Sequence, residues 1–117
     1  MGELLGTDLT LRIAAQSLGL SESTVAALQE IFSQQVGIRR VIVYGSRAID
    51  RYREGSDIDL VLDAPKLSFD DLLTLMVAID DSWIPQEVDL ALLHEVTNAD
   101  LLGHIERVGI VVFEGID

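Results

Sequence analysis

The sequence contains no cysteine, only two prolines, and few aromatic residues, at 5% of the chain. The lack of cysteine excludes disulfides and thiolate metal sites. No apolar run approaches the roughly 20 residues that cross a bilayer. Residues 1–6 also lack the basic start and long apolar centre of a signal peptide. We therefore expect a cytoplasmic protein with no membrane segment.

Basic residues are also scarce: 8 Lys and Arg stand against 20 Asp and Glu, which gives a net charge of −12. Proteins that grip long nucleic acids neutralise phosphates with Lys and Arg, so such a partner is not expected. The acidity is compatible with solubility through self-repulsion, with a basic partner surface, or with metal ions. Five of the eight basic residues fall in one short stretch, which favours a small bound anion there: Arg39, Arg40, Arg47, Arg51 and Arg53.

The length of 117 residues and the apolar fraction of 49% predict one globular domain, residues 1–117, with an aliphatic core. Residues 1–20 form an N-terminal extension, in which a short helix is expected over residues 9–18, ended by Gly19. Ser21 and Ser68 are each followed by apolar residues at helical spacing, as at helix N-caps. Gly37 suits the position after the first of these helices.

Helices and strands alternate along the predicted chain. A short helical or irregular piece is expected at residues 48–52, and a further helix at 98–108. Strands are expected at residues 41–44, 57–62, 87–92 and 110–113, because these stretches are rich in β-branched and other apolar residues. The alternation predicts an α/β fold, with helices flanking a central sheet. It does not determine whether that sheet is parallel or mixed.

Two carboxylates open the second expected strand. Asp57 and Asp59 point the same way, because side chains in a strand alternate between the two faces. Two such neighbours repel each other unless a positive charge neutralises them, and Mg²⁺ prefers oxygen ligands of this kind. Asp89 has a similar setting within the third strand. If the two strands are neighbours, the three acids can hold two Mg²⁺ ions, with Asp89 as general base or shared ligand.

Gly45 and Ser46 follow the first strand directly. Glycine lets a backbone approach a phosphate closely, and a helix that started here would direct free N–H groups at a triphosphate tail. The Ser46 hydroxyl adds a further donor, and Arg47, together with Arg51 or Arg53, is expected to neutralise phosphate charge. The Gly-Ser pair, the Asp-x-Asp pair and the isolated Asp89 together predict a site for a nucleoside triphosphate and divalent metal.

The residues 43–48 (VYGSRA) and 55–60 (GSDIDL) resemble the signature of the DNA polymerase β-like nucleotidyltransferase superfamily. More closely, the chain resembles the minimal nucleotidyltransferases, small prokaryotic proteins encoded beside a helical HEPN-type or substrate-binding partner. The likeness runs from about Ser21 to Phe113. One departure is that family members commonly carry a glycine shortly after the Arg-Ala pair, where this sequence has Ile49 and Asp50.

The resemblance implies a mixed-sheet nucleotidyltransferase fold and Mg²⁺-dependent transfer of a nucleotidyl group, typically AMP from ATP. It also implies a toxin–antitoxin or two-subunit context, in which some members adenylylate a tyrosine of the partner. The family's metal ligands correspond to Asp57, Asp59 and Asp89, and its phosphate-binding pair to Gly45 and Ser46.

We therefore expect a transferase that acts on a hydroxyl of a partner protein or small molecule. The alternative is a non-catalytic binding module that neutralises a helical partner by forming a stoichiometric complex. The candidates for partner contact are Trp83, Ile84 and the N-terminal extension, although ordinary core or edge packing explains each residue at least as well. His94 and His104 lie at no metal-ligand spacing and are expected to be structural.

Overall fold

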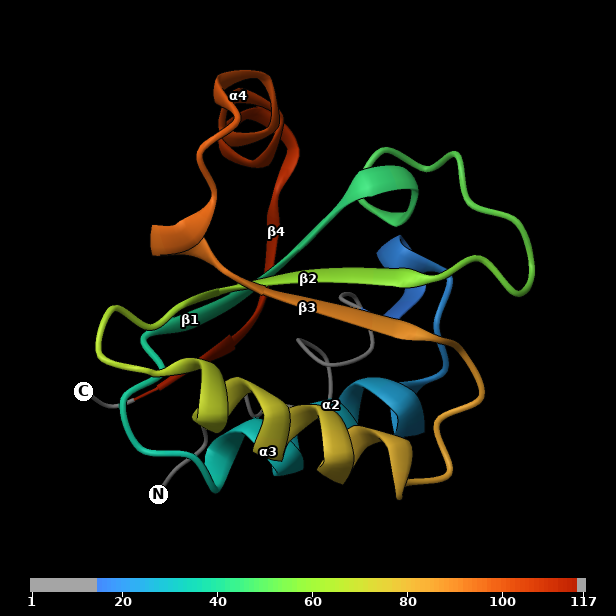
Figure 1. Ribbon diagram of the computed structural model, residues 1–117. Coiled ribbons are helices and arrows are strands. Elements are labelled where there is room, and N and C mark those ends of the chain that lie inside the picture. Colours follow the sequence, from blue (N-terminus) through green and yellow to red (C-terminus); the bar gives the residue numbers. More distant parts are fainter. Residues whose placement is uncertain (1–14, 116–117) are drawn as a thin grey trace.

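The computed structural model describes residues 15–115 and shows the four-stranded sheet of Figure 1 with helices on both of its faces. Most of the helix expected over residues 9–18 therefore lies outside the described residues, of which 15–18 are helical. The elements that follow are α2 (Glu22–Ser33), β1 (Arg40–Tyr44), η2 (Gly45–Arg47), β2 (Ile58–Asp63), α3 (Phe69–Asp80), β3 (Val88–Leu92), η3 (Leu93–Glu95), α4 (Ala99–Val108) and β4 (Ile110–Glu114).

The sheet is mixed, with strand order β3-β2-β1-β4. Strand β1 pairs antiparallel with both β2 and β4, while β2 and β3 run parallel. The parallel pair requires a crossover, which α3 provides between β2 and β3. This arrangement confirms the expected α/β class with a mixed central sheet.

The helices begin where the sequence predicts. The Ser21 side chain accepts from the N–H of Thr24 at the start of α2, and Asn98 accepts from Leu101 at the start of α4. Ser68 and Asp71 form a reciprocal capping box at the start of α3. Because these caps satisfy N–H groups that no helical carbonyl reaches, each helix starts at a defined residue.

The two faces of the sheet bury different amounts of apolar surface. Figure 1 shows α2 and α3 together on one face and α4 on the other. The α2/α3 side holds the main core, in which Phe32, Val41 and Leu60 are fully buried. On the α4 side only a small cluster forms, centred on Ile42, Val61 and Ile105. The α4 side therefore leaves part of its sheet face uncovered by apolar packing.

Not every apolar residue of α3 is buried: 41% of Leu73 is exposed, because Leu72, Leu75 and Ile79 already supply the inward face of the helix. Residues 48–52, for which a short helical or irregular piece is expected, form no helix, and the three-residue 3₁₀ turn η2 precedes them.

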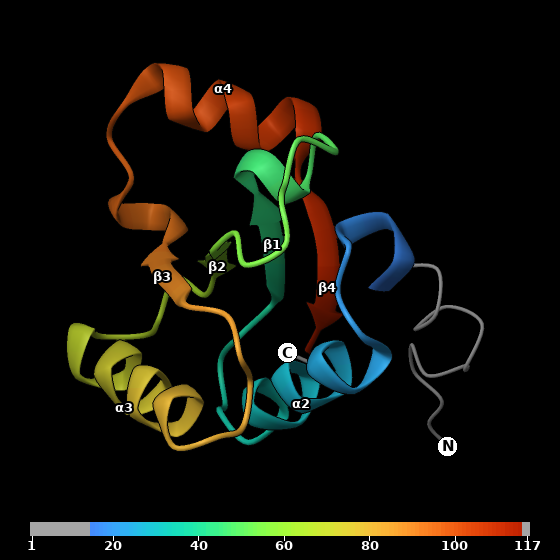
Figure 2. The same cartoon turned by 90° about the vertical axis from the view of Figure 1, so that its right-hand side faces the viewer.

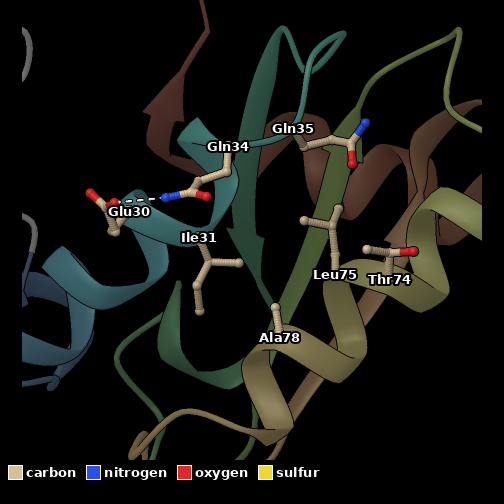
Figure 3. Close-up of a pocket in the computed structure, with 7 residues that line it drawn as sticks. All are labelled: Glu30, Ile31, Gln34, Gln35, Thr74, Leu75 and Ala78. Carbon is tan, nitrogen blue, oxygen red and sulfur yellow. Dashed lines mark hydrogen bonds between the residues drawn. The ribbon is translucent and has the colours of Figure 1, made fainter.

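A groove runs between α2 and α3 on the side of the main core (Figure 3), with a volume of about 420 Å³. Its lining residues are Glu30, Ile31, Gln34, Gln35, Thr74, Leu75 and Ala78. None of the three predicted metal-binding acids lines it, so it is separate from the candidate site described below. Among the described residues, no helix is long and apolar enough to cross a membrane.

Candidate functional site

The two strand acids lie side by side on neighbouring strands. In the parallel register of β2 and β3, Asp59 pairs with Asp89. Tyr44 of β1 stands opposite Asp59 on the other side, so these three residues form one row across the sheet. The row belongs to the α4 side, because Asp59 alternates with the inward-facing core residues Leu60 and Ile58. Residues that are separate in the sequence thus meet at one place.

The electrostatics of this row reflect that proximity. The pKa of the Asp59 carboxyl is raised, first by burial, then by the charges of Asp89 and Asp57, and also by a side-chain hydrogen bond with Asp89. Burial and the charges of Asp59 and Asp89 likewise raise the pKa of the Tyr44 hydroxyl. The acids therefore place several negative charges close together in a half-buried position. A bound cation would reduce the repulsion between them.

The donor set suits a hard divalent cation, since carboxylate oxygens on adjacent strands are what Mg²⁺ prefers. Asp59 is half-buried, whereas Asp57 and Asp89 are exposed. In the part of the chain that the structure describes, no group of three or more Asp, Glu or His side chains is arranged as a ready-made metal cage. The pair Asp59 and Asp89 thus fits a metal-binding role, while Asp57 would have to turn toward them.

Gly45 lies directly against Asp59. Its φ of 76° is in the left-handed region that glycine tolerates. A Cβ placed on Gly45 would collide with the Asp59 carboxylate. Glycine is therefore required twice at this position, for its backbone conformation and for the space that Asp59 occupies.

Ser46 follows Gly45 within η2, and its hydroxyl makes no hydrogen bond to any described residue. The turn is only three residues long, so the helix dipole expected after Ser46 is absent. What remains at this position is a short turn of backbone N–H groups with one hydroxyl, next to the acidic pair.

Arg47 is placed differently from the expected phosphate contact. Its side chain is 1% exposed, and its guanidinium donates to backbone carbonyls of Leu18, Gly19 and Ser56 at 2.8–3.2 Å. The guanidinium carbon also lies 5.2 Å from the centre of the Tyr52 ring. Burial lowers its pKa, while Tyr52 and Asp57 act in the opposite direction. Arg47 thus ties the two ends of the loop after Ser46 to the segment before α2.

The departure at Ile49 and Asp50 has a structural counterpart. Asp50 has a φ of 61°, the one positive φ among the described residues other than glycine. The N–H of Arg51 donates to the carbonyl of Ser46 at 2.9 Å and closes this turn. Aspartate tolerates the left-handed region better than most residues, so the chain takes this path without the family's glycine.

His104, which the sequence-based analysis expected to be structural, lies at this site. The backbone N–H of Gly45 donates to Nε2 of His104 in α4 at 3.1 Å. The imidazole also meets the Tyr44 ring edge-on, with centroids 6.3 Å apart. Figure 2 shows α4 passing over the end of β1. The usable signal was that His104 shares the apolar face of its helix with Leu101 and Ile105.

A family model matches most of the chain. The profile of the family described as polymerase beta, nucleotidyltransferase matches residues 26–115. No curated protein sequence matches the chain.

Solved structures share the fold. A mutant of the toxin–antitoxin pair MntA-HpeT superposes with a TM-score of 0.61 at 19% identity, over 81% of this chain and 74% of that one. A toxin–antitoxin with AMP-PNP gives 0.57 at 20% identity, with the same coverage. The toxin–antitoxin MntA-HepT gives 0.55 at 16%, over 80% and 73%.

The family match covers most of the chain and includes the Gly-Ser turn and all three acids. The mixed sheet with flanking helices is the fold shared with the solved relatives. This chain belongs to the polymerase β nucleotidyltransferase family.

Proposed function

We propose that this protein transfers a nucleotidyl group, AMP from ATP, to a hydroxyl of a partner protein or small molecule. The observation that carries the proposal is the position of Asp59 beside Asp89 on neighbouring strands, with Gly45 directly against Asp59. Crowded carboxylates next to a glycine turn suit a triphosphate that brings divalent cations.

In this proposal Asp57, Asp59 and Asp89 hold two Mg²⁺ ions, which supply neutralisation of the phosphate charge. The backbone of Gly45 and Ser46 and the Ser46 hydroxyl bind phosphate oxygens. Arg51 and Arg53, the other two arginines expected to neutralise phosphate, are exposed in the loop that follows and would supply this positive charge. Arg47 itself holds the loop in place.

The acceptor hydroxyl oxygen attacks the α-phosphorus of ATP in line with the leaving group. A phosphorus–oxygen bond forms, the bond to the oxygen that bridges the α- and β-phosphates breaks, and pyrophosphate leaves with that electron pair. The hydroxyl proton passes to a carboxylate, for which Asp89 is exposed at the open end of the row.

The partner in this proposal is a helical HEPN-type subunit, with this chain as its antitoxin or catalytic subunit in the cytoplasm. Support comes from solved structures of the same fold, which are toxin–antitoxin pairs, one of them with AMP-PNP. The decisive experiment incubates the protein with ATP labelled at the α-phosphate, Mg²⁺ and a HEPN-type partner. Label on the partner and release of pyrophosphate support transfer, and the absence of both refutes it for that acceptor.

A second candidate function is stoichiometric neutralisation of the same partner without catalysis. The observation that favours it is an exposed apolar row on α3, formed by Phe69, Leu73 and Val77, which are 60%, 41% and 59% exposed. These residues recur every four positions and so share one side of the helix. The double variant Asp57→Ala/Asp59→Ala separates the two functions. Neutralisation that survives it supports binding alone, and neutralisation that is lost while the complex still forms supports catalysis.

A further inference from the structure

The side chain of His104, 59 positions further along the chain, makes a hydrogen bond with the backbone of the glycine turn. The Gly45 N–H donates to Nε2 of His104 at 3.1 Å, and this contact is partly buried. His104 lies on α4, which packs on β1 through Ile105 and its neighbours. The turn is thus connected to a helix on the same side of the sheet as Asp59.

The direction of this bond defines the state of the ring. An Nε2 that accepts from a backbone N–H carries no hydrogen, so the imidazole that makes the bond is neutral and has its hydrogen on Nδ1. The edge-on contact with the Tyr44 ring restrains the plane of the imidazole. His104 is therefore aimed at one atom of the turn.

The bond holds the N–H side of Gly45, whereas the other contacts of the turn hold its carbonyl and the residues that follow. The Gly45 carbonyl accepts from the Ala48 N–H at 3.1 Å, and the Ser46 carbonyl accepts from the Arg51 N–H at 2.9 Å. The left-handed φ of Gly45 lies between these two sides of the residue. His104 anchors the peptide that joins Tyr44 to Gly45, and this orientation sets where the N–H and hydroxyl of Ser46 point.

We propose that His104 is a positioning residue of the nucleotide site: through the Gly45 N–H it holds the glycine-serine turn in the conformation that receives the triphosphate. The inference rests on the proposed function, because it concerns the same turn. A site that is already ordered loses less conformational entropy when the ligand binds, so removing the anchor weakens binding.

The test compares His104→Ala and His104→Gln with the unchanged protein, with His94→Ala as a matched control in exposed η3. Binding of AMP-PNP with Mg²⁺ is measured by calorimetry, and exchange of the Gly45 amide hydrogen by NMR without nucleotide. His104→Ala is expected to weaken binding and speed exchange, each about fivefold to tenfold, as for the loss of one hydrogen bond. His104→Gln, whose side-chain carbonyl can accept from the same N–H, is expected to restore much of both. His94→Ala is expected to change neither.

Equal binding by His104→Ala and the unchanged protein would overturn the inference and leave the proposed function intact. Weaker binding with unchanged Gly45 exchange would also overturn it, because His104 would then act on the nucleotide directly. If the unchanged protein fails to bind AMP-PNP with Mg²⁺, the proposed function fails and the inference falls with it. Thermal unfolding of each variant establishes that the compared proteins are folded.

Discussion

Asp59 and Asp89 occupy opposite positions in the parallel register of β2 and β3, and the charge of Asp89 contributes to the raised pKa of the Asp59 carboxyl. Two acids in this relationship destabilise the fold when both are charged, unless a cation binds between them. Carboxylates placed where their charge costs stability are typical of a functional site.

The first prediction concerns stability without metal. Burial and Asp89 raise the pKa of Asp59, so the folded protein holds this proton more tightly than the unfolded chain does. The resulting cost is absent below the unfolded-state pKa, grows as pH rises through the folded-state pKa, and is complete above it. Asp59→Asn, which carries no charge, should therefore raise the Tm in EDTA near neutral pH. The gain should vanish in acid.

Asp63→Asn is the matched control, because Asp63 lies on the same strand and face but pairs with Arg40 at 3.0 Å. Asp63→Asn should leave the Tm unchanged or lower it slightly. A Tm gain for Asp59→Asn that persists at low pH would contradict the electrostatic explanation.

The second prediction adds Mg²⁺ to the same proteins. Binding to the folded state raises the Tm of the unchanged protein, in proportion to the logarithm of the Mg²⁺ concentration above the dissociation constant. Asp59→Asn and Asp89→Asn should each abolish most of this rise, as measured by differential scanning fluorimetry. An equal Mg²⁺ response in all three proteins would place the metal elsewhere.

The third prediction concerns transfer. Asp59→Ala and Asp89→Ala should each lower the rate of AMP transfer by about a hundredfold or more, as when a group that stabilises transition-state charge is removed. Asp63→Ala should retain most of the rate, since Asp63 lies at the far end of β2. Rates are measured as label incorporated into the partner. Comparable losses at all three positions would indicate damage to the strand rather than to a site.

The fourth prediction concerns Arg47. Arg47→Met leaves the buried carbonyl of Leu18 and the part-buried carbonyls of Gly19 and Ser56 without their donor, and should cost roughly 2–4 kcal/mol of unfolding free energy. Arg51→Met, an exposed arginine of the same loop, should cost less than about 0.5 kcal/mol. Denaturant titration measures both. A small effect of Arg47→Met on stability with a large loss of ATP affinity would restore the phosphate contact that the sequence predicted.

The fifth prediction concerns Asp50, whose φ of 61° favours glycine. Asp50→Gly should be neutral or stabilising, while Asp50→Val should destabilise by about 1–2 kcal/mol, because a β-branched residue resists the left-handed region. Both free energies come from denaturant titration. A destabilising Asp50→Gly would show that the carboxylate itself stabilises the loop.

The sequence alone predicted most helices and strands, and the neighbouring positions of Asp59 and Asp89, for a physical reason. Caps such as Ser21 and Ser68 and the period-two alternation around Asp59 are local signals, which the chain carries wherever it folds. The roles of Arg47 and His104 depend on contacts with residues 18–19 and with Gly45, far away in the sequence. No local sequence pattern predicts such contacts. The sequence around an arginine beside a glycine turn is the same whether its guanidinium binds phosphate or backbone carbonyls.

Strand β3 lies at the margin of the sheet, and within residues 15–115 no further strand lies beyond it. Asp89 therefore lies at the edge of the sheet, with Asp59 on one side and solvent on the other. A deep pocket would admit only small acceptors. In the proposed transfer, a row of acids that reaches the edge of the sheet would allow a bulky acceptor to bring its hydroxyl up from the side, without entering the domain.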